Sequence, residues 1–145
     1  MDDVRSINQV TTGVRAMKQM SILIMLWSIS LSVNALGLGG MTVYSDLTQS
    51  MNAEIRLVGA KNADLPKLKI SIASPDIFKQ NGVPYMPSLQ QFTFKTEEKP
   101  NGDMVIKVSS KEPVYEPVIE FVLDVSWPRG HLRRIYSVIM DPPTM

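Results

Sequence analysis

Apolar and polar residues alternate in several stretches of the chain after residue 50. In the clearest stretch, Ile119, Phe121, Leu123 and Val125 occupy every second position. Successive side chains of a strand point to opposite faces, so this period of two predicts strands with one buried face. Together with apolar runs at both ends of the domain, the pattern predicts seven strands, at residues 41–46, 53–57, 67–72, 92–95, 104–108, 118–125 and 132–140.

Turn-forming residues separate the predicted strands. Asn101-Gly102 predicts a hairpin, because this pair tolerates the positive φ of a type I′ turn. Glu112-Pro113 and Glu116-Pro117 bracket a segment predicted to be a short extended crossover. Proline is tolerated in a sheet only at an edge or at the start of a strand, so Pro113 and Pro117 limit the strands that carry them.

Residues 74–81 favour a short helix instead of a strand. Ser74 is a suitable N-cap, and Pro75 fits the first helical position. Seven short strands with frequent turns and one short helix predict an all-β fold, an immunoglobulin-like β-sandwich. The chain has no cysteine to bridge the two sheets. We therefore expect Trp127, mostly buried, to fill the centre together with the phenylalanines of the strands, Phe92, Phe94 and Phe121.

The N-terminal part of the chain has the pattern of a secretory signal peptide. Residues 19–45 contain no charge, and the apolar run 20–33 follows Lys18. Small residues before the bond between Ala35 and Leu36 suit a signal peptidase. The sequence thus predicts a helical signal peptide over residues 1–35, cleavage after Ala35, and export to the periplasm.

Two alternatives concern this segment. A translation start at Met17 would give a more compact basic region than a start at Met1. An uncleaved segment would instead anchor the protein in the inner membrane, although the 14 residues of the run 20–33 fall short of the ~20 that span a bilayer as a helix. Gly37–Gly40, which follows the predicted cleavage site, is expected to be a flexible lead-in to the first strand.

Charge and composition argue against a nucleic-acid partner. The net charge of the chain is +1, and the part after Ala35 carries as many acidic as basic residues. The one adjacent pair of arginines, Arg133-Arg134, is too small a basic patch to neutralise a phosphate backbone. The chain also offers no thiol chemistry, because it has no cysteine.

No pattern of residues predicts catalysis, a cofactor or a metal site. His131 is the only histidine, and beside two arginines it is expected to be a surface residue. Glu97 and Glu98 are adjacent, so in a strand they would point to opposite faces. Thioethers favour Cu(I), but the methionines of the predicted domain fall in separate elements, at Met41, Met51, Met86 and Met104. We therefore expect a protein that is not an enzyme.

An ordered set of short motifs resembles one known family. The stretches "LGLGGMTVYSDLTQSMNAEIRL" (36–57), "SIASPDIF" (71–78), "VSSKEPVYEPVIEFVLDVSWPRG" (108–130) and "RIYSVIMDPP" (134–143) are similar to the N-terminal periplasmic domain of FimV/HubP-type proteins. These are bacterial landmark proteins of the cell pole, associated with type IV pili. The structural signature of the resemblance is Trp127, Pro128, Gly130, Tyr136, Asp141 and Pro142. It covers residues 36–143 and leaves 144–145 as a tail.

The resemblance implies a small β module without catalysis. It suggests a periplasmic protein as the partner, in the pilus or secretion machinery, and a membrane contact only if the signal peptide is uncleaved. Family members continue into a peptidoglycan-binding LysM domain, a transmembrane helix and a cytoplasmic part. None of these follows Pro143 here, so peptidoglycan binding is not expected.

Two further interpretations stay open. The domain could act as a chaperone-like sandwich that captures an extended segment by strand addition, or it could be a non-functional fragment of a longer FimV-like gene. A long unprotected edge strand would favour strand addition, whereas edges blocked by Pro113, Pro117 and lysines would favour recognition by a face or a loop.

Overall fold

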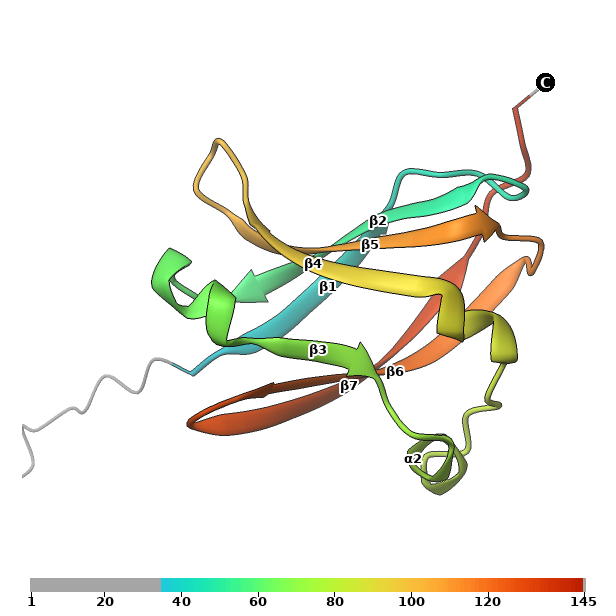
Figure 1. Ribbon diagram of the computed structural model, residues 1–145. Helices are drawn as coiled ribbons and strands as arrows, with labels where there is room; N and C mark the ends of the chain where they lie inside the picture. The colour runs from blue at the N-terminus through green and yellow to red at the C-terminus, as the bar shows by residue number, and fades with distance from the viewer. Residues whose placement is uncertain (1–34, 145) are drawn as a thin grey trace, which may run out of the picture. The chain divides into compact units, whose positions relative to one another are not determined.

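Two antiparallel sheets pack face to face in the computed structural model, which describes residues 35–144 (Figure 1). One sheet has the strand order β1-β2-β5-β4 and the other β3-β6-β7. This is the strand arrangement of a constant-type immunoglobulin sandwich, so the predicted fold class is confirmed. The strands are β1 (Gly37–Val43), β2 (Ser50–Val58), β3 (Lys69–Ile72), β4 (Phe92–Glu98), β5 (Met104–Pro113), β6 (Val118–Trp127) and β7 (Gly130–Ile139). Except for Ala35, the predicted signal peptide lies outside the described residues.

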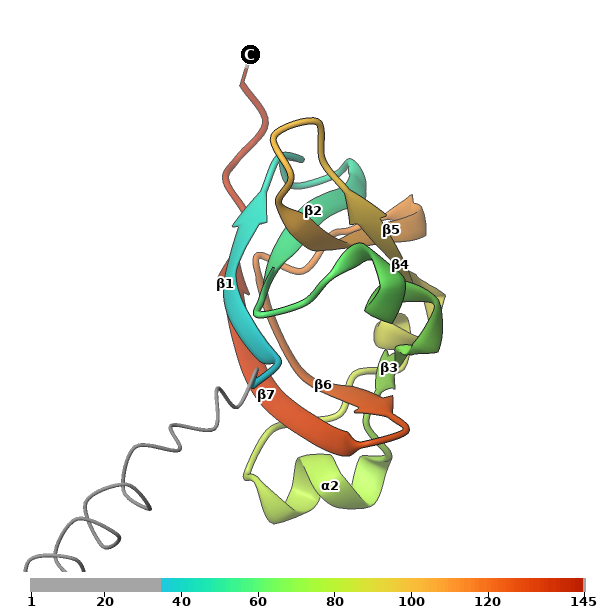
Figure 2. The same ribbon diagram turned by 90° about the vertical axis from the view of Figure 1, so that its left-hand side faces the viewer.

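The predicted helix is present as α2 (Pro75–Gln80), with Ser74 in the N-cap position. The Ser74 side chain makes no capping hydrogen bond, although its backbone is extended as an N-cap requires. Figure 2 shows α2 against the outer face of the β3-β6-β7 sheet, where Phe78 and Val122 are fully buried. Two 3-10 helices that the sequence pattern did not predict, η1 (Asn62–Lys67) and η2 (Pro87–Gln91), flank β3 and β4.

Phe121 stands at the centre of the core between the two sheets. Its ring centroid lies 5.5 Å from that of Tyr136, 6.4 Å from that of Phe92 and 6.5 Å from that of Phe94. The expectation that Trp127 fills this centre is wrong. Trp127 has the inward parity of Phe121 and Val125 and packs against the core, mostly buried as expected, but it is the last residue of β6 and lies at this end of the sandwich.

The first strand differs from its prediction. Gly37–Gly40 is the first half of β1 rather than a flexible lead-in, and β1 ends at Val43 instead of residue 46. A bulge between Leu38 and Met41 shifts the pairing of β1 with β2. A Cβ atom at Gly39 would lie 3.1 Å from Cβ of Arg56, so the missing side chain permits this close pairing.

The hairpin predicted at Asn101-Gly102 joins β4 to β5, but not through a type I′ turn. The Gly102 N–H donates to the Lys99 carbonyl over 2.8 Å, and the Lys99 N–H donates to the Asp103 carbonyl over 2.8 Å. Only Gly102 has a positive φ in this loop, at 87°. A type I′ turn needs positive φ at two consecutive residues, whereas Pro100 fixes a negative φ; the result is a three-residue loop that ends in a glycine bulge.

Candidate interaction surfaces

The two sheets leave four edge strands, which meet in two places that we name seams. The closed seam lies between β1 and β7, and the open seam lies between β3 and β4 (Figure 2). The prolines that would have blocked an edge lie elsewhere. Pro113 ends β5, which is paired on both sides, and Pro117 precedes β6, which is also paired on both sides.

Side chains of β7 fasten the closed seam to the bulge of β1. The Tyr136 hydroxyl donates to the Gly39 carbonyl over 2.9 Å, and the Arg134 guanidinium donates to the Leu38 carbonyl. The same guanidinium lies 5.3 Å from the centroid of the Tyr136 ring, within range of a cation–π interaction. These bonds tie two consecutive carbonyls in the bulged part of β1 to β7.

Tyr136 is buried at this seam. Loss of solvent raises the pKa of Tyr136 to about 12, because burial disfavours the charged phenolate, while the nearby Arg134 charge lowers it in part. The phenol therefore keeps its proton and its hydrogen bond to β1 well above neutral pH. Of the signature residues, Tyr136 is the one that joins the two sheets directly.

The other signature residues occupy the two ends of β7. Beyond the strand, the Asp141 carbonyl accepts the Leu47 N–H over 2.8 Å, and Pro142 is exposed. At its start, Gly130 packs beneath the indole of Trp127, and a Cβ atom at this position would lie 2.6 Å from Cζ2 of the ring. Pro128 is exposed in the turn between them. The signature thus marks how β7 is fixed to the rest of the sandwich.

The predicted cleavage site lies beside a second glycine. Gly59 has φ of 74°, and a Cβ atom there would lie 2.4 Å from the Ala35 carbonyl oxygen. Ala35 is exposed, whereas Leu36 is half-buried and packs against the core. Cleavage between these two residues remains a prediction.

The open seam is a shallow groove with an apolar floor and polar walls between the edges of β3 and β4. Two hollows of about 530 and 460 Å³ follow it, and both are lined by Ile70, Phe94 and Lys95. No strand within residues 35–144 pairs with the outer edge of β3 or of β4. The alternation of residues 92–95 predicted the strand β4, but it could not show that this strand lies at an edge.

Hydrogen-bond parity identifies the backbone groups that face the open seam. Lys99 and Asp103 form a hydrogen-bonded pair, so the N–H and C=O groups of odd-numbered residues in β4 face β5. The backbone groups of Phe94 and Thr96 consequently face away from β5. By the same argument from the bond between Ala73 and Val122, the backbone groups of Ile70 and Ile72 in β3 face away from β6.

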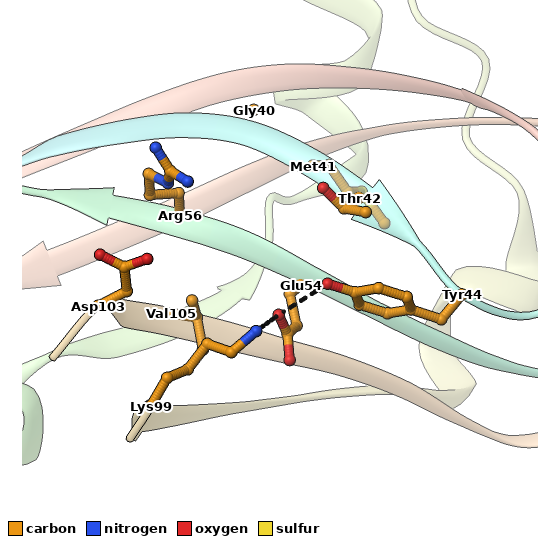
Figure 3. A pocket seen from close by; sticks show the side chains of 9 residues that line it. All are labelled: Gly40, Met41, Thr42, Tyr44, Glu54, Arg56, Lys99, Asp103 and Val105. Carbon is orange, nitrogen blue, oxygen red and sulfur yellow. Dashed lines mark hydrogen bonds and ion pairs between the residues drawn. The ribbon is translucent and has the colours of Figure 1, made fainter. Parts of the chain in front are cut away.

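A polar groove on the outer face of the larger sheet was not predicted from sequence (Figure 3). Glu54 accepts hydrogen bonds from Lys99 over 2.7 Å and from the Tyr44 hydroxyl over 3.1 Å. The bond to Lys99 holds the pKa of Glu54 below its usual value, and Glu54 in turn raises the pKa of Lys99. Arg56 and Asp103 line the same hollow of about 350 Å³. The three residues of the bonded cluster come from separate elements, so their spacing in the sequence gave no pattern.

The residues considered for catalysis do not converge in the structure. His131 is exposed and contacts Asp124, which also accepts a hydrogen bond from Arg133 over 3.1 Å. The part of the chain that is described contains no group of three histidine, aspartate or glutamate side chains placed to hold a metal ion. Within the same part, no helix has both the length and the apolar character needed to cross a membrane.

Comparisons with known proteins agree with this architecture. The profile of the FimV N-terminal domain, described as Ig-like, matches residues 36–143. The chain belongs to the FimV N-terminal domain family. It is 38% identical over 135 residues to the motility hub protein FimV of Pseudomonas aeruginosa strains PAO1 and UCBPP-PA14, an alignment that covers 93% of this chain. The chain spans only 14% of the length of these FimV proteins, and no solved structure matches it.

Proposed function

We propose that this FimV-type domain is a non-enzymatic interaction module of the periplasm, which binds a protein of the pilus or secretion machinery at the cell pole. The relatives are named as motility hub proteins, which supports a role in motility and not in metabolism. The chain spans only a small part of those relatives. We therefore propose for it only the interaction made by this domain, and not the role of a whole relative.

The open seam is the observation that favours an interaction module. It combines the apolar floor of a groove with backbone donors and acceptors that have no strand partner among residues 35–144. Pro113 and Pro117 do not obstruct it, since Pro113 ends β5 and Pro117 precedes β6, and both of these strands lie in the middle of a sheet. Each edge strand of the open seam does carry one exposed lysine, Lys69 in β3 and Lys95 in β4, but no proline, so of the two modes considered we favour strand addition over recognition by a face or a loop.

Export can be tested separately from binding. The charge-free run 20–33 and the small residues before Leu36 support passage through the inner membrane. A β-lactamase fused after Met145 should give ampicillin resistance, and the same fusion without residues 1–35 should not. The intact mass of the exported protein should correspond to a chain that begins at Leu36. Resistance from both fusions, or from neither, would contradict the periplasmic location.

The interaction role can be tested in the bacterium that encodes the chain. Deletion of the gene should reduce pilus-dependent surface motility, and expression of the unchanged chain should restore it. As a control for folding alone, the Lys79→Glu variant, altered on the exposed side of α2, should restore motility equally well. Normal motility after deletion would argue against a role in the pilus machinery.

A further inference from the structure

We infer that the open seam binds an extended, acidic segment of the partner, which adds to β4 as an extra strand. This inference rests on the proposed function and specifies its binding site and the chemistry of the bound segment. The strand β4 is the better template of the two edges, because it has seven residues, whereas β3 has four.

The backbone of β4 supplies the hydrogen bonds for an added strand. The N–H and C=O groups of Phe94 and Thr96 face the seam, and the Phe92 N–H is already used by the Leu89 carbonyl. An incoming strand can therefore pair along the middle of β4, at Phe94 and Thr96. At the closed seam the corresponding place is occupied, since Tyr136 and Arg134 already bind the carbonyls of β1.

The floor of the groove selects for alternating apolar residues. Ile70 and Phe94 are half-buried and line both hollows, and the fully buried Leu89 borders one of them. Side chains at every second position of an added strand would fall over this floor, while the others would face solvent. The bound segment should thus carry apolar residues at alternate positions, over about four to six residues.

The charges beside the groove select for acidic residues. Lys95 lines both hollows, while Lys67 and Lys69 are only sequence neighbours of the lining residues Leu68 and Ile70. All three lysines are exposed, and none of them forms a salt bridge with the described part of the chain. The acids of β4, Glu97 and Glu98, lie at its far end, where Glu98 accepts a hydrogen bond from Asn62. A second copy that paired through its own β4 with Lys95 opposite Lys95 would bring like charges together, whereas an acidic segment would neutralise Lys95.

Photocrosslinking of the full chain in its host bacterium tests this inference. The photoreactive residue p-benzoylphenylalanine replaces Gln90, which is exposed and borders the open seam, and in separate strains Ile139 or Lys79. After irradiation, mass spectrometry identifies the crosslinked peptide. We expect an adduct at position 90 whose peptide alternates apolar residues and contains acidic ones, and none at position 79.

Two variants distinguish strand addition from simple proximity. Thr96→Pro removes one N–H that faces the seam and no bond to β5, so it should lower the yield at position 90 about tenfold while the domain stays folded. Lys95→Glu should also lower the yield, whereas the matched charge reversal Lys79→Glu should not. An adduct that is unaffected by Thr96→Pro would overturn strand addition.

The remaining outcomes separate this inference from the proposed function. An adduct with a second copy of the chain, or with a segment that lacks acidic residues, would refute the inferred partner. Adducts at position 139 alone, on the exposed apolar face of β7, would refute the open seam but leave an interaction module in place. If neither position 90 nor 139 gave an adduct, both proposals would fail.

Discussion

The two seams of this sandwich join the same pair of sheets, yet they differ in how their edge strands are satisfied. At the closed seam, Tyr136 and Arg134 donate hydrogen bonds to the bulged carbonyls of β1. At the open seam, β3 and β4 face each other across a groove with an apolar floor, and neither has a partner on its outer edge within residues 35–144. From this difference we expect the closed seam to contribute more to stability than the open seam, which is the proposed binding site.

The largest difference in stability between the two seams is expected from a change at Tyr136. Tyr136→Ala removes a buried ring that stacks on Phe121 and a hydrogen bond to Gly39, so it should destabilise the domain by about 3–5 kcal/mol. Phe94→Ala at the open seam should cost less, because that ring is partly exposed and makes no hydrogen bond. Urea denaturation of residues 36–145, whose core lies within the described part, measures both. Equal losses in the free energy of unfolding would mean that the two seams contribute equally to the stability of the domain.

Alkaline pH should weaken the closed seam specifically. The folded pKa of Tyr136, about 12, lies above the ordinary value of 10, so the folded state holds this proton more tightly than the unfolded state does. The corresponding stability is present below pH 10 and is lost as the pH rises from 10 to 12, by about 2–3 kcal/mol. Tyr136→Phe, which keeps the ring, should have a smaller loss over this range. A parallel pH profile for both proteins would contradict this role of the phenol.

A substitution at Gly130, which lies outside both seams, tests whether a loss of stability elsewhere in the domain leaves binding at the open seam unchanged. Gly130→Ala places a methyl group against the Trp127 indole, which has to move, and should cost about 1–3 kcal/mol. In a double-mutant cycle, the double variant Gly130→Ala/Trp127→Ala should lose less stability than the sum of the two single losses, because without the indole the methyl group at position 130 has nothing to clash with. Additive losses would show that Gly130 is required for another reason. Crosslinking at position 90 should be unchanged in both variants if they stay folded.

The smallest effect on stability is expected at the open seam itself. Thr96→Pro should change the free energy of unfolding by less than about 1 kcal/mol, because the lost N–H faces away from β5. Lys95→Pro, one position earlier, removes an N–H that faces β5 and should cost about 3 kcal/mol or more. Thermal melts of the two variants compare them directly. A large loss from Thr96→Pro would mean that the edge of β4 already has a structural partner.

Most strands could be predicted because the alternation of apolar and polar residues indicates which face of a strand is buried. In β6, for example, the alternating residues Phe121, Leu123 and Val125 are all buried. Alternation does not show, however, where along a strand the central part of the core ends. Trp127 continues the inward parity and packs against the core, as expected, but it is the last residue of β6 and so lies at an end of the sandwich and not at its centre.

The seams depend on contacts that are distant in the sequence. Gly37–Gly40 has almost no side-chain pattern, and its conformation is fixed by Arg134 and Tyr136, about a hundred residues further on. The bonded cluster of Glu54, Lys99 and Tyr44 likewise spans three elements. Which strands are edges follows from the strand order, which local patterns do not contain. The resemblance to the family, in contrast, rests on short motifs that follow one another along residues 36–143 and can be seen without the strand order.

The close approach of Gly59 to the Ala35 carbonyl has a consequence for the order in which cleavage and folding take place. If signal peptidase cuts between Ala35 and Leu36, as we expect, the bond it must reach is one that the folded domain partly covers, with Leu36 packed against the core and Gly59 beside the carbonyl. A protease needs its substrate extended and accessible. Cleavage and folding would then compete for the same residues, and processing would have to come first, while the chain is still emerging on the far side of the membrane.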